Sequence, residues 1–146
     1  MFKDRIPNDS RVLKEESNRL MRELEKSGVS EDLIFDIHVG FEEALRNAMV
    51  HGNRNDPDKM VSIEVRLLPD AVLIIIEDEG EGFDHMDIPD PTTDDNLLKE
   101  GGRGVYLIHR LMDEVEYANK GRRVIMKKFL RKSPAKMNGG TDADQC

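Results

Sequence analysis

The hydrophobic pattern of this chain changes its period after the polar segment 52–59, and that change limits the folds the chain can adopt. Apolar side chains first recur at helical spacing, which predicts amphipathic helices over about 10–26 and 31–51. After the polar segment Gly52 to Lys59, apolar and polar residues alternate over 61–67, which predicts a strand with one solvated face. A β-branched run at 72–76 predicts a central, more deeply buried strand. Helices and strands are therefore both expected.

Shorter elements are expected on either side of this region. They are a weak edge strand at 2–6, a helix over 104–113, and strands at 115–118 and 123–130 joined by a hairpin at 119–121. The acidic segment 84–99, with two prolines, predicts a loop. These elements predict a single domain over 1–130, followed by a disordered polar tail at 131–146.

The composition narrows the class of protein. The chain has 146 residues, 36% of them charged, which suits one globular domain. No apolar run is long enough to span a bilayer, so no membrane location is expected. A net charge of -8 argues against direct nucleic-acid binding, which needs a basic patch. The only cysteine is Cys146, which fits a cytoplasmic location.

Three short segments contain candidate binding residues, and the first lies on the second expected helix. Helical spacing places Gly40, Glu43 and Asn47 in one sector, away from the apolar stripe. A carboxylate can take a proton, and an amide oxygen can ligate a hard cation such as Mg²⁺. Taken alone, an ordinary solvated helix face explains this segment better.

The second segment follows the buried strand. The strand delivers Asp78 to a loop that contains Gly80 and Gly82, where glycines let the backbone approach a ligand closely. The Asp78 carboxylate could accept a hydrogen bond from an exocyclic amine such as that of adenine. An acidic turn is an equally good explanation of this segment alone.

The third segment is a glycine cluster before a helix, Gly101-Gly102-Arg103-Gly104. Backbone N–H groups at a helix N-terminus favour phosphate, although a flexible linker is the alternative. The cluster is not a Walker A loop, because no Gly-Lys-Ser/Thr follows. The three segments in this order indicate an ATP site, since nucleotide binding needs all three parts together.

The ordered segments resemble the GHKL ATPase superfamily, which includes histidine-kinase catalytic domains, gyrase-type ATPases and anti-sigma serine kinases. The matching stretches are Glu43 to Gly52, Asp78 to Phe83 and Gly102 to Ile108. The chain looks most like the small bacterial anti-sigma-factor serine/threonine kinases of partner-switching systems, for which Met112 to Val115 (Met-Asp-Glu-Val) is a particular mark. The resemblance covers about residues 8–130.

The resemblance implies a fold and a set of site residues. The implied fold is a two-layer α/β sandwich, with a mixed, mainly antiparallel sheet and helices on one face. ATP and Mg²⁺ are the implied cofactors, with Asn47 as metal ligand, Asp78 reading adenine and Glu43 as general base. The implied nucleotide-binding residues are Asn47, Asp78, Gly80, Gly82, Gly101, Gly102, Arg103 and Gly104. Residues 84–99 correspond to the ATP lid.

The resemblance also implies a function with named partners. The leading hypothesis is a kinase that phosphorylates an antagonist protein and sequesters a sigma factor, with a homodimer as a possible assembly. The alternative is a partner-switch module that uses ATP only as a structural ligand, but the presence of Glu43 favours an enzyme. A third hypothesis is a detached histidine-kinase catalytic domain. The absence of a helix pair bearing a phosphoacceptor histidine argues against it.

Two positions depart from the family pattern. Glu100 stands immediately before the glycine cluster, where some family members have a basic residue that could help to neutralise phosphate; here Lys99 precedes it. This departure bears on the rate of transfer more than on binding. Family members also direct a basic residue of the first helix towards the partner, and Arg11 and Lys14 are the nearest candidates.

Overall fold

The computed structural model of the protein describes residues 1–82 and 100–130. Its helices are α1 (Ser10–Lys26), α2 (Glu31–Asn47), the π-helical continuation η1 (Ala48–Gly52) and α4 (Glu100–Leu111). Its strands are β1 (Phe2–Pro7), β2 (Met60–Leu67), β3 (Ala71–Glu77), β4 (Glu114–Ala118) and β5 (Arg123–Phe129). The expected loop or lid at 84–99 and the expected tail at 131–146 lie outside the described residues.

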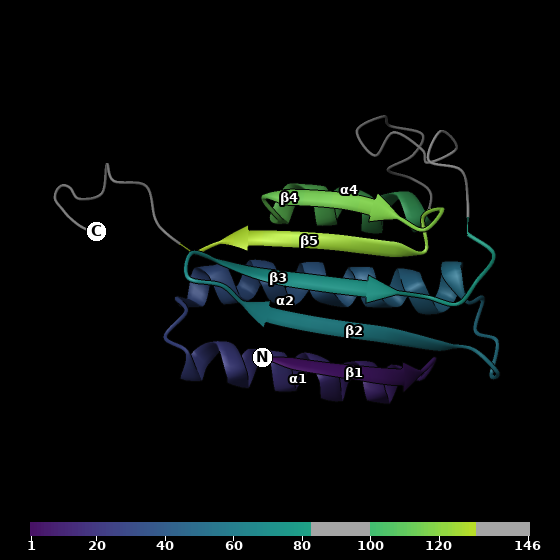
Figure 1. The fold of residues 1–146 in the computed structure, drawn as a ribbon, viewed down its shortest axis with the longest axis horizontal. Coiled ribbons are helices and arrows are strands. Elements are labelled where there is room, and N and C mark those ends of the chain that lie inside the picture. The colour runs from purple at the N-terminus through teal and green to yellow at the C-terminus, as the bar shows by residue number, and fades with distance from the viewer. Residues whose placement is uncertain (83–99, 131–146) are drawn as a thin grey trace, which may run out of the picture.

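The strands form one sheet, in the order β1-β2-β3-β5-β4. The helices lie on one face of this sheet, so the molecule has two layers (Figure 1). This arrangement confirms the expected α/β sandwich with a mainly antiparallel sheet; all four pairings among the described strands are antiparallel. In the described part of the chain, no helix is both long and apolar enough to cross a bilayer.

The core lies between the sheet and the helices. Alternate residues of β2, such as Val61 and Val65, point towards the helices and are buried, whereas Ser62 and Arg66 on the other face are exposed. From the helical layer, the apolar stripe of α2 completes this core with fully buried side chains at Ile37, Phe41 and Leu45. The central strand β3 has the expected heavy burial, because it pairs on both sides with β2 and β5.

The last turn of the second expected helix differs from the prediction. We expected one α-helix over 31–51, but α2 ends at Asn47 and η1 continues it with wider hydrogen bonding, in which Asn53 N–H donates to the Ala48 carbonyl at 2.8 Å. Single π-helical turns are frequent at functional sites. Here the wider turn ends at Gly52, beside the end of β3.

The third helix also differs in its bounds, since α4 begins at Glu100 and not at Gly104. The glycine cluster therefore forms the start of the helix, where the first N–H groups have no intrahelical partner. Gly40, which helical spacing placed in one sector with Glu43 and Asn47, has a packing role in the structure. A Cβ atom at buried Gly40 would lie 3.1 Å from the Met112 sulfur, so this glycine allows α2 to pack beside the end of α4.

Candidate functional site

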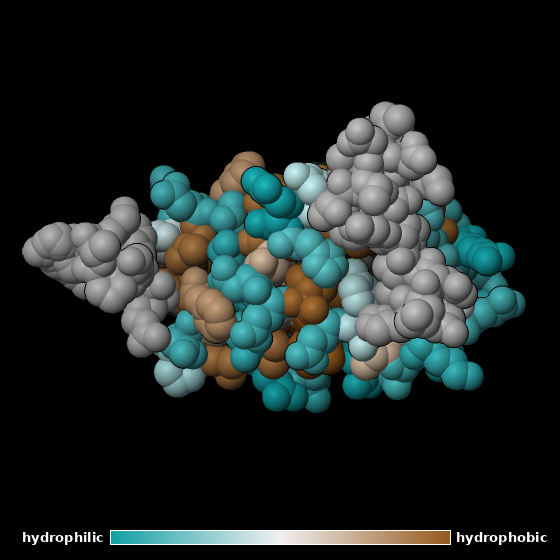
Figure 2. Space-filling view, turned by 90° about the horizontal axis from the view of Figure 1, so that it is seen from above, coloured by the Kyte–Doolittle hydropathy of each residue, from teal (hydrophilic) through white to brown (hydrophobic). Residues whose placement is uncertain are grey.

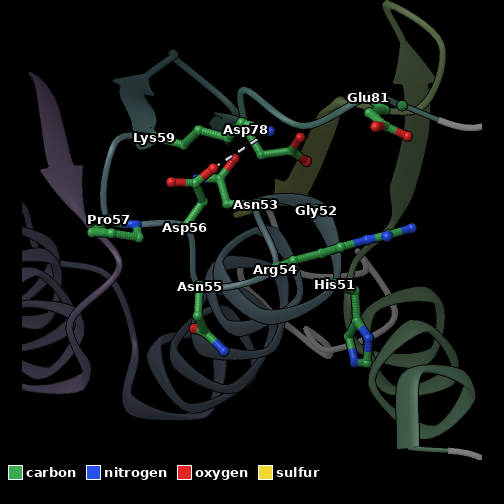
Figure 3. A pocket seen from close by; sticks show the side chains of 11 residues that line it. His51, Gly52, Asn53, Arg54, Asn55, Asp56, Pro57, Lys59, Asp78 and Glu81 are labelled. Carbon is green, nitrogen blue, oxygen red and sulfur yellow. Dashed lines mark ion pairs between the residues drawn. The ribbon is translucent and has the colours of Figure 1, made fainter.

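Two neighbouring cavities lie where α2, η1 and β3 end. The first, of about 370 Å³, contains the predicted pair Glu43 and Asn47. It is lined by Glu43, Arg46, Asn47, Val50, His51, Gly104 and Leu107. The second, of about 400 Å³, contains Asp78, Glu81, Gly82 and the polar segment from His51 to Lys59 (Figure 3). His51 lines both cavities, so they adjoin.

The first cavity brings together residues from two distant segments. A Cβ atom at Gly104 would lie 3.0 Å from Oε1 of Glu43 and 3.1 Å from both side-chain polar atoms of Asn47. Any larger residue at position 104 would therefore press on both side chains. The start of α4 thus lies directly against the carboxylate and the amide.

Asp78 lies in a cradle made by two glycines. A Cβ atom at Gly52 would lie 2.2 Å from Oδ2 of Asp78, and one at Gly80 would lie 2.0 Å from the Gly52 carbonyl oxygen. The Gly80 N–H donates to Oδ1 of Asp78 at 2.8 Å. Asp78 is only 8% exposed, and this burial raises the pKa of its carboxyl, while the Gly80 N–H and the charge of Arg122 oppose the rise.

Gly82 has a different role from the cradle glycines. Its φ of +81° lies in the left-handed region, which side-chain-bearing residues rarely adopt. A Cβ atom here would also lie 2.7 Å from the Lys120 carbonyl oxygen in the hairpin between β4 and β5. Gly82 therefore lets the chain that follows β3 pass close to this hairpin.

No sequence pattern pointed to Asn53, although it organises the second cavity. The Asn53 side chain is buried, and its amide donates to Asn8 Oδ1 at 3.0 Å and to the Met60 carbonyl at 2.9 Å. Its carbonyl oxygen accepts from Glu79 N–H at 2.8 Å. Asn53 thereby ties the segment after η1 to the ends of β1, β2 and β3. From the sequence it looks like one more residue of a polar loop.

Arg46 is a second residue that the sequence analysis did not identify. It projects into the first cavity, and its Nη1 donates to Oε2 of Glu43 at 2.8 Å. The spacing of three residues on one helix could have suggested this pair. Nothing in the sequence indicated that the pair would face Gly104. The other predicted residues of the cluster, Gly101 to Arg103, lie in the first turn of α4.

The residues fit a nucleotide with a metal ion. The glycines let the backbone approach Asp78 and Glu43 so closely that any Cβ atom there would crowd the site. Among the described residues, no group of three or more His, Cys, Asp or Glu side chains could hold a metal by itself. A hard cation here would take the amide oxygen of Asn47 and complete its shell with phosphate oxygens and water, as Mg²⁺ commonly does.

The fold and a family match together define the class of protein: the chain belongs to the histidine kinase-like ATPase domain family, whose model matches residues 6–128. Use of ATP follows from this family. Among similar proteins, serine-protein kinase RsbW of Staphylococcus epidermidis is 33% identical over 122 residues, and serine-protein kinase RsbW of Staphylococcus aureus (strain Newman) is 34% identical over the same length. Each match covers 78% of this chain and 77% of the relative.

Proposed function

We propose that this protein is an ATP-dependent protein-serine/threonine kinase of a partner-switching system. The observation that supports this most strongly is the close approach of Gly104 of α4 to the Glu43–Asn47 pair of α2, because we expect phosphate at the start of α4 and a base at Glu43. A protein that used ATP only as a structural ligand would not need this carboxylate. The similarity to serine-protein kinases named RsbW supports the same proposal.

Each residue has a defined task in the proposed reaction. Asp78 accepts a hydrogen bond from the amine of adenine, and the glycine cluster at the start of α4 donates backbone N–H groups to phosphate. Asn47 holds Mg²⁺, which when bound neutralises phosphate charge. Glu43 accepts the proton of the acceptor hydroxyl, the one base that a reaction dominated by positioning and charge neutralisation requires.

The proposed partners follow from the resemblance to the anti-sigma kinases. The acceptor hydroxyl belongs to a serine or threonine of an antagonist protein. The second partner is a sigma factor, which the kinase sequesters until unphosphorylated antagonist displaces it. All three proteins are expected in the cytoplasm.

The test compares wild type with Glu43→Gln, which keeps the size and polarity of the side chain but removes the base. Extract from the native cell is incubated with each purified protein and ATP, and mass spectrometry identifies newly phosphorylated proteins. Wild type should modify one small protein on serine or threonine. Glu43→Gln should bind ATP equally well in calorimetry but lower the transfer rate by about 10²-fold or more.

A pull-down with the same two proteins identifies the binding partners. Both proteins should retain the sigma factor, because Glu43 acts in transfer and not in sequestration. If wild type retains its antagonist yet leaves every serine and threonine of it unmodified, the protein is a binding module and the kinase proposal is wrong.

A further inference from the structure

Arg46 forms an ion pair with the proposed base, Glu43, within the first cavity. The two residues are three positions apart on α2, and Arg46 Nη1 donates to Glu43 Oε2 at 2.8 Å. Pairs with this spacing on an open helix surface contribute little to stability. This pair differs because it lines a cavity: the side chain of Glu43 is only 24% exposed, whereas that of Arg46 is 47% exposed.

The two carboxylate oxygens of Glu43 have different neighbours. Oε2 accepts from Arg46, while Oε1 faces Gly104 at the start of α4. A carboxylate without a partner can rotate about its last side-chain bond. The guanidinium limits this rotation by fixing Oε2. The other oxygen, Oε1, is then left pointing towards the expected phosphate site.

Arg46 also borders a third hollow, here called the α1 groove. This groove, of about 610 Å³, is lined by Asn8, Ser10, Arg11, Leu13, Lys14, Glu15, Arg46, Met49, Val50 and Asn55. Arg46 and Val50 line both the α1 groove and the cavity of Glu43. Arg46 thus lies between the cavity of Glu43 and the α1 groove.

We infer that Arg46 is a positioning residue for phosphoryl transfer, which holds Oε2 of Glu43 so that Oε1 points to the acceptor hydroxyl. This inference rests on the proposed kinase function. An arginine suits the task because its planar group offers several N–H donors in a fixed geometry, whereas a lysine ammonium is a mobile point charge. Arg46 acts through Glu43 and makes no contact with the reacting atoms.

The kinetic test uses the acceptor protein that the extract labelling identifies. Arg46→Ala should lower kcat by about 10- to 100-fold, because a small misplacement of a catalytic group has an effect of that size. The KM for the acceptor and the Kd for ATP should stay within about twofold of wild type. Arg46→Lys should restore part of kcat. The matched control is Arg66→Ala, which removes another exposed arginine paired with a glutamate, here Glu64 on the outer face of β2.

A double-mutant cycle tests whether Arg46 acts through Glu43. In the Glu43→Gln background, Arg46→Ala should have no further effect on kcat, because the base that it orients is gone. An equal additional loss in that background would overturn the inference. So would an increase in the acceptor KM with kcat unchanged, since Arg46 would then bind the acceptor and not position the base.

A measurement without turnover separates this inference from the proposed function. In ¹⁵N NMR spectra of the full chain, the side-chain signals of Arg46 should shift in Glu43→Gln and stay unchanged in Glu64→Gln, which instead shifts those of Arg66. If the side-chain signals of Arg46 stay unchanged in Glu43→Gln, the inference is overturned, whether or not any acceptor is phosphorylated. If Arg46 responds to Glu43 but wild type transfers no phosphate, the proposed function is wrong and the positioning role is rejected with it.

Discussion

At the scale of single residues, Asp78 offers a direct test of which base the second cavity accepts. In the proposed function, adenine presents an amine to this carboxylate, whereas guanine would present a carbonyl at the same place. Asp78→Asn keeps the shape but turns one oxygen into a donor. It should weaken ATP binding by about 10- to 150-fold, as expected for the loss of a charge-assisted hydrogen bond of about 1.5–3 kcal/mol. It should also reduce the ratio by which the protein prefers ATP to GTP.

Isothermal calorimetry with ATP and GTP measures both effects. The control is Glu81→Gln, which neutralises another carboxylate that lines the same cavity and should not weaken ATP binding. Thermal unfolding of each variant checks that the cradle of Gly52 and Gly80 is intact. Equal ATP affinity in Asp78→Asn and wild type would rule out Asp78 as the base-reading residue.

The sequence predicted some residues of this site and missed others for a physical reason. Glu43 and Asn47 are one helical turn apart, so local geometry alone places them in one cavity. The spacing of Glu43 and Arg46 could have suggested that pair in the same way, but Asn53 could not be found so. The importance of Asn53 comes from partners at Asn8 and Glu79, far away in sequence, and no periodicity encodes such contacts. The roles of all these residues in ATP binding stay predictions.

At the scale of elements, the contact between β1 and α1 contains an acid pair that should make stability depend on pH. Burial and a hydrogen bond to Asp4 raise the pKa of Glu16 on α1 to about 7, and the same hydrogen bond lowers the pKa of Asp4 on β1. Between about pH 4.5 and 7, the folded protein therefore keeps a proton on Glu16. In the unfolded chain Glu16 has a pKa of 4.5 and has already released that proton. The stabilisation of the fold that protonated Glu16 provides is fully present below pH 4.5 and is lost as the pH rises through about 7.

Glu16→Gln should remove this dependence. Between pH 5 and 8, wild type should lose on the order of 1–2 kcal/mol more free energy of unfolding than the variant, after allowance for solvent screening around Asp4. Urea unfolding at several pH values measures the difference. Glu15→Gln, on the exposed face of α1, should keep the wild-type profile. Parallel profiles for wild type and Glu16→Gln would show that Glu16 is not protonated in the folded state near neutral pH.

Most elements could be predicted from the sequence, but their arrangement could not be derived from it. The alternation in β2 shows which face is buried because side chains on a strand alternate every second residue. The same pattern does not show that β3 lies between β2 and β5, which depends on pairing between distant segments. The resemblance to the GHKL superfamily, not the periodicity, predicted the sheet with helices on one face. The π-helical turn at the end of α2 had no local signal at all.

At the scale of the whole molecule, ligand binding should raise thermal stability through the metal. A ligand at 100 times its Kd stabilises the folded state by about 2.7 kcal/mol, so ATP with Mg²⁺ should raise Tm by several degrees. ATP with a chelator should raise it less. In Asn47→Ala the difference between these two conditions should largely disappear, because the ion loses its protein ligand.

Differential scanning calorimetry measures the four combinations of protein and metal. The control is Asn18→Ala, which removes an exposed amide from α1, outside both cavities, and should behave as wild type. If Asn47→Ala retains the full effect of Mg²⁺, Asn47 is a surface amide and the ion has other ligands.

The pairing of β3 with β5 has a consequence for how the chain reaches its native state. Ile75 lies opposite Ile125, about fifty residues later in the sequence, whereas β2 and β3 form a local hairpin. Asp78 N–H donates to the Arg122 carbonyl, and Gly82 packs against Lys120, so the second cavity depends on the distant partner strand. Bringing such remote segments together costs more conformational entropy than closing a short hairpin, and this cost slows folding. We therefore expect the hairpin to form early and the ability to bind adenine to appear late, so that the newly made chain has a partly ordered sheet before it has a nucleotide site.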